Sequence, residues 1–256
     1  MPEGEIFTSE EYREVYPIGI EHHFWNIARN DLVHRWLSPH LRDGDLVMDV
    51  GCGTGIVVNE LKSRGVTICG VELGAAPVMP GLEDDVQTET DLFDLDDTLK
   101  ARISIVLLLD VIEHIQDRQQ FLQRIFRELP NCRLLLLTVP ARMEIWSDYD
   151  RHWGHYLRYD RRGLEKELLQ SGFTPQKTAY FFHWVYLASI AMGLLGLAKS
   201  TDFQAMESHG IKAFCHRLLG LFTRLESRLV PGFVAGSSIA CSASRCEIAE
   251  PPPPQP

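Results

Sequence analysis

The sequence predicts an α/β fold of the doubly wound class, built on a mostly parallel sheet of seven strands. First, segments with strand character alternate along the chain with segments of helical periodicity, the order that produces a parallel sheet covered by helices. Second, the runs at 103–111 and 132–140 are almost continuously apolar, as expected for strands buried on both faces. Third, a glycine-rich turn at 51–55 directly follows the first strand.

Each element follows from its own pattern. Strands are expected at 46–50, 67–73, 86–90, 103–111, 132–140, 173–182 and 237–246, and helices at 21–38, 54–64, 116–129 and 161–171. The helix at 116–129 has the clearest apolar stripe, formed by Phe121, Leu122, Ile125, Phe126 and Leu129. Gly172 is a good C-cap and should end the helix at 161–171.

Composition narrows the class of protein. The chain has 256 residues, of which 45% are hydrophobic and 23% charged, which suits one globular domain with a sizeable core. We expect this domain over 1–250 and a disordered proline-rich tail at 251–256. The net charge of −10 argues against nucleic acid as a partner, because a phosphate backbone requires a basic surface. Six cysteines without a CxxC pair and an acidic N-terminus without an apolar core predict a cytoplasmic protein.

The turn after the first strand has the pattern of a ligand-binding turn. Gly51, Gly53 and Gly55 follow Asp49 at every second position, and a residue without a Cβ lets a ligand approach the backbone closely. In a doubly wound sheet, ligands bind beyond the carboxyl ends of the strands. Glu72 ends the second strand roughly 20 residues after Gly51, the separation at which a carboxylate accepts hydrogen bonds from ribose hydroxyls. These features predict a nucleotide cofactor.

The spacing of the glycines distinguishes between cofactors. A dinucleotide-binding turn reads GxGxxG, whereas this chain reads D-x-GxGxG from Asp49, which resembles motif I of the class I S-adenosylmethionine-dependent methyltransferases. "GVEL" at 70–73, "TDLFDL" at 90–95 and "LLLDVIEHIQD" at 107–117 resemble later motifs of that class. "HFWNIARN" at 23–30 and "GHYLRY" at 154–159 resemble segments of its type 11 and type 12 branch. The resemblance covers about residues 20–182.

This resemblance implies a Rossmann-like fold and S-adenosylmethionine as the cofactor. It implies that Glu72 binds the ribose, that Asp91 lies near the exocyclic amine of the adenine and that Leu92 lies against the ring. Arg29 is a candidate partner for the methionine carboxylate, because a guanidinium binds a carboxylate with two hydrogen bonds. The residues expected to contact the cofactor are Asp49, Gly51, Cys52, Gly53, Gly55, Glu72, Asp91, Leu92, Asp110 and Arg29.

The methyl acceptor is expected just past the fourth strand, near Asp110, Glu113 and His114. Methyl transfer from a sulfonium is an in-line displacement, so the protein mainly aligns the reacting groups and excludes water. A hydroxyl acceptor also benefits from a base or a metal ion. In one interpretation, His155 or His152 is the general base.

Two other interpretations of the same residues stay open. D-x-x-E-H at 110–114 resembles the E-x-x-E-H element of metal-binding small-RNA 2′-O-methyltransferases and ubiquinone-pathway O-methyltransferases. That resemblance implies a divalent ion held by Asp110, Glu113, His114 and His155, although Asp110 has a shorter side chain than the glutamate of the element. Alternatively, Glu113 and His114 only cap the start of the next helix and hydrogen-bond the loops.

A helical hairpin is expected at 181–230, inserted between the last two strands. The part at 181–198 has no charged residue and is nearly long enough to span a bilayer, but the last two strands must pair in one sheet, so the chain returns to the same side. The part at 211–230 is amphipathic and cannot span. The hairpin is therefore a lid or homodimer surface, or it lies in a membrane interface. The first is favoured by residues that allow close helix packing: His183, Ser189, Gly193 and Gly196.

These observations predict an enzyme that methylates a small molecule, with oxygen as the expected acceptor atom. The apolar hairpin favours an acceptor that is apolar or linked to a lipid or glycan, and a location in the cytoplasm, either free or peripheral at the membrane. One alternative is a C- or N-methyltransferase of a natural product or peptide. Another is a cofactor-binding partner subunit without catalysis. A nicotinamide dehydrogenase is disfavoured by the glycine spacing.

Overall fold

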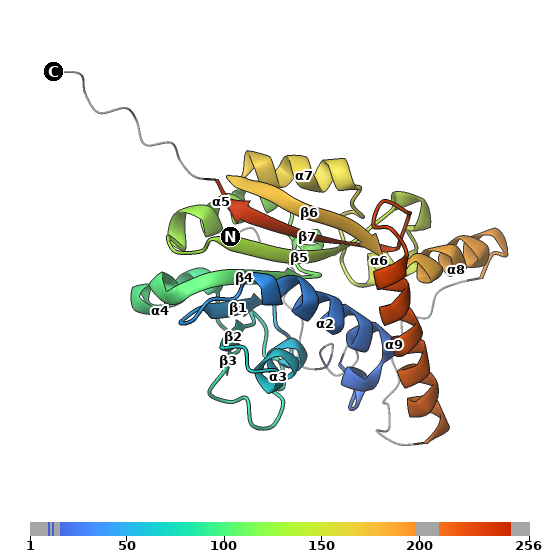
Figure 1. Cartoon of the computed structure of the whole chain (residues 1–256), viewed down its shortest axis with the longest axis horizontal. Helices are drawn as coiled ribbons and strands as arrows, with labels where there is room; N and C mark the ends of the chain where they lie inside the picture. The colour runs from blue at the N-terminus through green and yellow to red at the C-terminus, as the bar shows by residue number, and fades with distance from the viewer. Residues whose placement is uncertain (1–9, 11, 13–15, 198–209, 247–256) are drawn as a thin grey trace.

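The computed structural model describes residues 10, 12, 16–197 and 210–246. It contains one seven-stranded sheet in the order β3-β2-β1-β4-β5-β7-β6 (Figure 1). Strands β1 to β5 pair in parallel, and β7 runs antiparallel between β5 and β6. The strands are β1 (Leu46–Val50), β2 (Ile68–Val71), β3 (Val86–Gln87), β4 (Ile103–Leu109), β5 (Leu134–Pro140), β6 (Phe173–Phe181) and β7 (Ser238–Arg245). The predicted doubly wound sheet is confirmed.

Helices cover both faces of the sheet, so the core has two halves. Helices α2 (Phe24–Leu37) and α3 (Ile56–Ser63) pack on one face, and α5 (Arg118–Glu128) and α7 (Arg161–Gln170) pack on the other. The alternation of side chains along β4 explains this arrangement. Ile105 and Leu107 belong to the first half of the core, whereas Val106 and Leu108 belong to the second.

Short helices were the elements that periodicity did not predict. These are α4 (Asp97–Arg102), α6 (Asp148–His152) and the 3-10 turns η1 (Ile20–His22), η2 (Ser38–His40), η3 (Leu92–Asp94), η4 (Ile112–His114) and η5 (Met143–Ile145). Each has at most six residues, too few for an apolar stripe to be seen. The helix expected from residue 21 begins at Phe24 instead, because the ring of His23 accepts the Trp25 N–H at 3.3 Å and caps α2.

The order of the strands reverses between β1 and β4, which lie side by side in the middle of the sheet. In this register Asp49 lies beside Leu107 and Val50 lies beside Leu108. The turn after β1 and the loop after β4 therefore meet at the same edge of the sheet. This is the topological switch point at which open α/β sheets bind ligands.

The predicted hairpin is present as two helices, α8 (His183–Leu194) and α9 (Ile211–Leu229), and residues 198–209 between them lie outside the described residues. Figure 1 shows α8 and α9 at one end of the molecule. Trp184 joins them, because its indole N–H donates to the Thr223 hydroxyl at 3.0 Å. Among the described residues, no helix combines the length and the hydropathy needed to cross a bilayer.

Close helix packing occurs, but not at the glycines that the sequence suggested. A Cβ at Gly193 or Gly196 would meet no atom within 4 Å, so neither residue is needed for packing. A Cβ at Gly220 would lie 2.8 Å from the Ile27 side chain. Gly220 therefore lets α9 approach α2, and Ala213 and Thr223 are buried on the same side of α9. The proline-rich tail expected at 251–256 lies outside the described residues.

Candidate active site

A cavity of about 1410 Å³ opens at the switch point between β1 and β4. Its walls come from the N-terminal segment, α2, the ends of β1 and β4, the loops around α6, and α8. Among the predicted cofactor residues, those that line it are Arg29, Gly51, Glu72, Asp91, Leu92 and Asp110. The four predicted catalytic residues also line it: Glu113, His114, His152 and His155. The structure thus brings most of the predicted site to one cavity.

The glycine turn forms one end of this cavity. Gly51, Gly53 and Gly55 have φ values of 70°, 56° and 90°, which side chains with a Cβ rarely adopt. The Glu72 carboxylate accepts the Gly53 N–H at 2.8 Å and the Gly74 N–H at 3.3 Å. Glu72 thus faces the cavity and also fixes the turn after β1 to the end of β2.

Four predicted cofactor residues do not line the cavity: the Tyr16 ring lies against Gly53, and Cys52, Gly55 and Asp49 lie behind the turn. The Cys52 thiol packs where a Cβ of Gly70 would be, within 2.6 Å, so its side chain belongs to the core. Gly55 caps α3, and a Cβ there would meet Leu82 at 2.9 Å. Asp49 is buried, and burial raises its pKa to about 7, against the opposing effect of Arg29. One Asp49 oxygen has no hydrogen-bond partner in the described part of the chain.

Two tyrosines at the cofactor end were missed by sequence reasoning. The Tyr12 hydroxyl hydrogen-bonds Glu72, and the Tyr16 ring lies 2.6 Å from where a Cβ of Gly53 would be. Both side chains line the cavity, and their rings stack with centroids 6.3 Å apart. The N-terminal segment has no apolar periodicity that would place it over the cavity. Its only signal is the spacing of four residues between two aromatic side chains.

The two residues predicted to bind the adenine, Asp91 and Leu92, both line the cavity. Asp91 caps η3 by accepting the Phe93 N–H at 3.0 Å, and Leu92 is buried behind it. One oxygen of Asp91 is therefore engaged, and the residue still lines the cavity.

Arg29 and Asp110 form an ion pair across the middle of the cavity. The Arg29 guanidinium donates to the Asp110 carboxylate at 2.9 Å and to the Asn26 side chain at 3.3 Å. Asp110 has a φ of 59°, an uncommon conformation for a residue with a Cβ. This backbone turn ends β4 and directs the Asp110 carboxylate towards α2.

The other end of the cavity holds a cluster of one carboxylate and two imidazoles. Glu113, His114 and His155 each place one potential ligand atom within 4.8 Å of the others. Both Glu113 oxygens are buried and have no hydrogen-bond partner among the described residues. Burial, reinforced by nearby Asp110, raises the pKa of Glu113 well above its usual range. Burial and the neighbouring His155 lower the pKa of His114 to about 4, so its ring is neutral at pH 7.

His155 is oriented by a buried ion pair. Its Nδ1 lies 3.0 Å from an oxygen of Asp150, which also accepts from the Arg158 guanidinium at 2.7 Å. Burial would raise the pKa of Asp150, but the hydrogen bonds from His155 and Arg158 outweigh it and lower that pKa to about 2. An ionised Asp150 favours the tautomer with the proton on Nδ1, which leaves the lone pair of Nε2 available. Asp150 and Arg158 were not predicted.

Two predicted residues lie outside this cluster. Asp110 is not brought to the three ligand atoms, because its carboxylate is bound to Arg29. Of the four predicted metal ligands, three therefore come together.

His152 is exposed at the end of α6, with its ring against Trp153 at 4.6 Å between centroids. The capping interpretation is supported only in part: helix α5 is capped by Asp117 rather than by Glu113 or His114, whereas the His114 ring hydrogen-bonds the backbone of Trp153 at the end of α6.

The donor set of this cluster fits a divalent transition metal. Two imidazoles and one carboxylate are ligands that Zn²⁺, Mn²⁺ and Fe²⁺ accept. The orphaned, buried Glu113 oxygens are the observation that supports the fit. The bond between His155 and Asp150 is the carboxylate–histidine contact that commonly orients a metal-binding imidazole.

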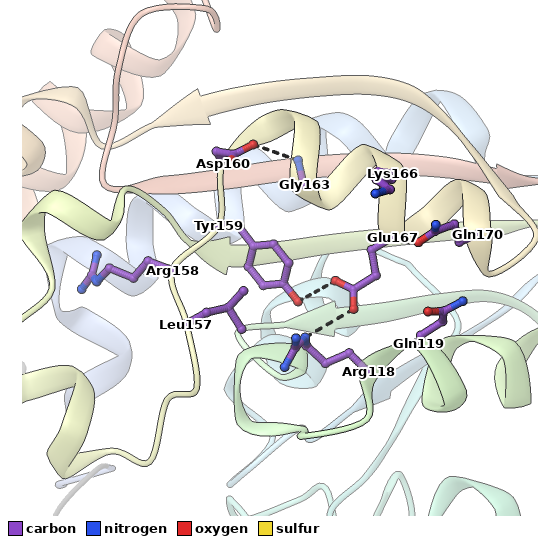
Figure 2. A pocket seen from close by; sticks show the side chains of 10 residues that line it. All are labelled: Arg118, Gln119, Leu157, Arg158, Tyr159, Asp160, Gly163, Lys166, Glu167 and Gln170. Carbon is purple, nitrogen blue, oxygen red and sulfur yellow. Dashed lines mark hydrogen bonds and ion pairs between the residues drawn. The ribbon is translucent and has the colours of Figure 1, made fainter.

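A second cavity, of about 260 Å³, lies between α5 and α7 (Figure 2). Its central carboxylate is already engaged. Glu167 accepts the Tyr159 hydroxyl at 3.0 Å and pairs with the Arg118 guanidinium at 3.3 Å. Asp160 caps α7 by accepting the Gly163 N–H at 2.8 Å. These contacts hold α7 against α5, and we assign this cavity a structural role.

Comparisons with known proteins agree with this geometry. A family described as "Methyltransferase domain" matches residues 21–178. The ubiquinone biosynthesis O-methyltransferase of Pseudomonas fluorescens strain SBW25 is 29% identical over 119 residues, 43% of this chain and 51% of that protein. The corresponding protein of strain Pf-5 is 31% identical over the same shares. The chain thus spans about half the length of these curated relatives.

Solved structures show the same fold at low sequence identity. Phosphoethanolamine N-methyltransferase 2 of Haemonchus contortus, solved with S-adenosyl-L-methionine, has a TM-score of 0.56 and 15% identity, over 95% of this chain and 61% of that one. Magnesium protoporphyrin IX methyltransferase of Synechocystis PCC 6803, solved with bound SAH, has a TM-score of 0.51 and 16% identity, over 86% and 83% of the two chains.

The family match covers more than half of this chain, and it includes the glycine turn, Glu72 and the cluster at the acceptor end. The family match does not identify a branch within the class, so the type 11 and type 12 assignment stays a prediction. Membership of the class itself does not depend on the branch. The chain belongs to the class I S-adenosylmethionine-dependent methyltransferases.

Proposed function

We propose that this protein transfers a methyl group from S-adenosylmethionine to a hydroxyl group of an apolar small molecule. The observation that carries the proposal is the single cavity with the glycine turn at one end and Glu113, His114 and His155 at the other. Its volume of about 1410 Å³ exceeds the roughly 300–1,000 Å³ of a pocket for one small ligand. The cavity therefore has room for a cofactor and an acceptor together.

S-adenosylmethionine, when bound, supplies a methyl group on a positively charged sulfur. At the cofactor end, Glu72 would accept hydrogen bonds from ribose hydroxyls in place of the Tyr12 hydroxyl that it holds now. The side chains of Tyr12 and Tyr16 would then have to move aside or cover the cofactor. In either position they would exclude water from the reacting groups.

At the acceptor end, His155 would take the proton from the acceptor hydroxyl through Nε2. Asp150 keeps the other ring nitrogen protonated and stabilises the imidazolium that results. Glu113, His114 and His155 would hold a divalent ion if the enzyme uses one. Such an ion would lower the pKa of a coordinated hydroxyl and make it a better nucleophile at neutral pH. Both alternatives place the acceptor oxygen beside His155.

The apolar side chains in the cavity wall support an apolar acceptor. Ile20, Trp25, Val185 and Met192 line the cavity, and the last two belong to α8, which has no charged residue. The names of the relatives specify O-methyl transfer in ubiquinone biosynthesis, which supports oxygen as the acceptor atom.

The proposal is tested with methyl-labelled S-adenosylmethionine, a panel of phenols, alcohols and amines, and a bacterial lipid extract. We expect label in an O-methyl product of an apolar phenol or lipid, detected by mass spectrometry. Loss of activity in EDTA that a divalent ion restores would support the metal interpretation, and insensitivity to EDTA would support the metal-free base. Label found only on amines or carbon would contradict the proposal.

A further inference from the structure

The exposed surface of α9 has no partner within the described residues. Its seven bulky apolar side chains are each 50–83% exposed, and we call them the α9 stripe: Ile211, Phe214, Leu218, Leu221, Phe222, Leu225 and Leu229. At 3.6 residues per turn they fall within an arc of about 100°. The buried residues Ala213, Gly220 and Thr223 lie on the opposite side of the helix, against α2. The stripe therefore faces away from the protein.

The charged residues of α9 are almost all cationic. The helix carries Lys212, Arg217, Arg224 and Arg228 but only one acidic residue, Glu226. Glu226 is half-buried, and its carboxylate accepts the Trp184 backbone N–H at 2.6 Å. No acidic side chain of α9 is therefore exposed, in a protein whose net charge is −10.

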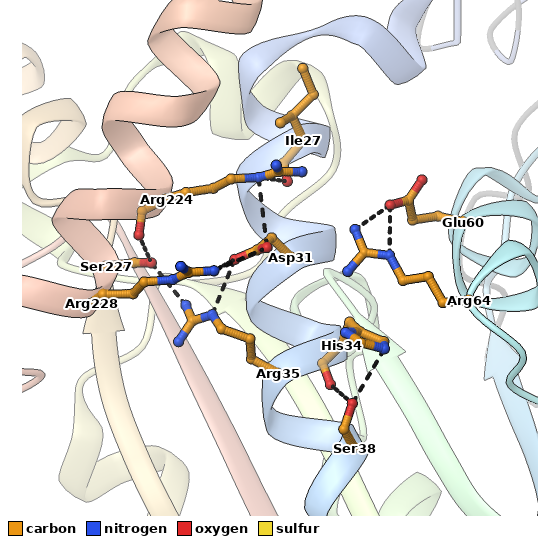
Figure 3. A network of polar contacts seen from close by, with 10 residues as sticks. All are labelled: Ile27, Asp31, His34, Arg35, Ser38, Glu60, Arg64, Arg224, Ser227 and Arg228. Carbon is orange, nitrogen blue, oxygen red and sulfur yellow. Dashed lines mark hydrogen bonds and ion pairs between the residues drawn. The ribbon is translucent and has the colours of Figure 1, made fainter.

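Arginines concentrate along one edge of the stripe, where α9 meets α2 (Figure 3). Arg35, Arg224 and Arg228 surround the single carboxylate of Asp31, at 3.1, 3.8 and 3.2 Å. One anion cannot neutralise three cations, so this cluster keeps an excess of positive charge. Arg228 is the most exposed of the three, with 52% of its side chain accessible.

Helix α8 also exposes apolar side chains. Leu187 and Leu194 are 65% and 84% exposed, and α8 carries no charged residue. Val185 and Met192 of the same helix line the large cavity. A surface that covered the exposed side of α8 would therefore lie close to the cavity.

We propose that the exposed faces of α8 and α9 dock the protein on an anionic lipid surface. An interfacial helix combines an apolar face of Leu and Phe with Lys and Arg beside it, and this is the composition of α9. Anionic headgroups supply the negative charge that the arginine cluster lacks. A second copy of the chain fits less well, because pairing two α9 stripes brings together two cationic helices, and an antiparallel pair places the two arginine edges side by side. Docking does not depend on the methyl-transfer proposal.

The test is co-sedimentation with vesicles of phosphatidylcholine alone or with 30% phosphatidylglycerol, at low salt and at 0.5 M salt. We expect pelleting with the anionic vesicles at low salt, and release at high salt, because screening weakens contacts between exposed charges. Leu218→Ser/Leu225→Ser should reduce binding at least tenfold. Arg228→Gln should reduce it roughly fivefold, the change for one cation at an anionic surface.

Matched controls separate docking from misfolding. Leu169→Ser removes an equally exposed leucine of α7, and Arg127→Gln removes an exposed arginine of α5; both should bind vesicles like the unchanged protein. All variants should bind S-adenosylhomocysteine normally in calorimetry, which keeps failure of docking distinct from failure of the enzyme. The proposal is overturned by no pelleting, by equal loss in the controls, or by a stable dimer in light scattering that the stripe variant dissociates.

Discussion

At the cofactor end of the cavity a short glycine turn sets the shape of the wall, whereas at the acceptor end side chains from distant segments form a cluster. The cofactor end is a turn of five residues whose glycines have positive φ and whose amide at Gly53 is held by Glu72. The acceptor end combines Glu113 and His114 from η4 with His155 from the loop after α6. We infer that the cofactor end depends on the backbone shape of the turn, and that the acceptor end depends on its ionisable side chains. A substitution at one end should therefore leave the other working.

The largest effect is expected from Gly53→Val at the cofactor end. A Cβ at this position would lie 2.6 Å from the Tyr16 ring, and the φ of 56° is strained for a β-branched residue such as valine. We expect no binding of S-adenosylhomocysteine in calorimetry. Gly65→Val is the matched control, because Gly65 has a φ of 83° but open space around its Cβ position. Adding Tyr16→Ala shows whether the clash with Tyr16 alone causes the loss. Normal binding by Gly53→Val would refute the role of the turn.

At the acceptor end, His155→Ala should lower turnover by roughly 10²–10⁴-fold, the usual contribution of a general acid or base. Asp150→Asn should give a smaller loss, because His155 remains but can adopt the wrong tautomer. Both losses are measured as initial rates on the acceptor that the labelling experiment identifies. A His155→Ala enzyme with full activity would reject both the base and the metal interpretation.

A moderate effect is expected from Glu72→Ala. We expect it to weaken binding of S-adenosylhomocysteine by about 1–3 kcal/mol, the range for a lost charge-assisted hydrogen bond. Tyr12→Phe should not weaken binding, because we expect the ribose to replace the Tyr12 hydroxyl at Glu72. Calorimetry on both variants gives the answer. Unchanged affinity in Glu72→Ala would remove its ribose role.

The smallest effect concerns the stability of the wall formed by α2. Burial, and then the neighbouring His216, lower the pKa of His23 from 6.5 to about 4. The folded state therefore prefers the neutral ring. As pH falls below about 6.5, the unfolded chain binds a proton that the folded chain refuses until about pH 4, so stability is lost over that window.

His23→Asn keeps a capping acceptor for α2 and removes this titration. We expect the free energy of unfolding in urea to change less between pH 7.5 and pH 5 in the variant than in the unchanged protein. An identical pH dependence in both proteins would show that His23 does not contribute.

The two ends of the cavity also differ in how far the sequence predicts them. The cofactor residues from Asp49 to Gly55 lie together in the sequence, and Glu72 follows at the end of the next strand, so the spacing of the glycines was enough to locate this end. The acceptor end was found only in part. Glu113 and His114 are adjacent in the sequence, but the ion pair of Asp150 and Arg158 that orients His155 depends on tertiary packing. The position of Asp110 also depends on tertiary packing, because its carboxylate pairs with Arg29 on α2 and does not join the cluster at Glu113.

The fold shows a similar division. Long, strongly apolar strands such as β4 and β5 were predicted within two residues of their ends, because burial on both faces leaves a continuous run. Helices α4 and α6 were missed, because their boundaries depend on local caps at Asp96 and Ser147. The hairpin was predicted as two helices, but periodicity could not show which apolar side chains would stay exposed.

If the two ends of the cavity act separately, changes at the acceptor end leave binding of the cofactor product intact. A calorimetric titration of S-adenosylhomocysteine into the double variant Glu113→Gln/His155→Ala, beside the unchanged protein, tests this. We expect the same affinity within about twofold and an unchanged stoichiometry, because the hydrogen bonds and ion pairs of the described residues join neither side chain to the glycine turn. A loss of tenfold or more would show that the acceptor end helps to build the cofactor site, and would contradict the separation of the two ends.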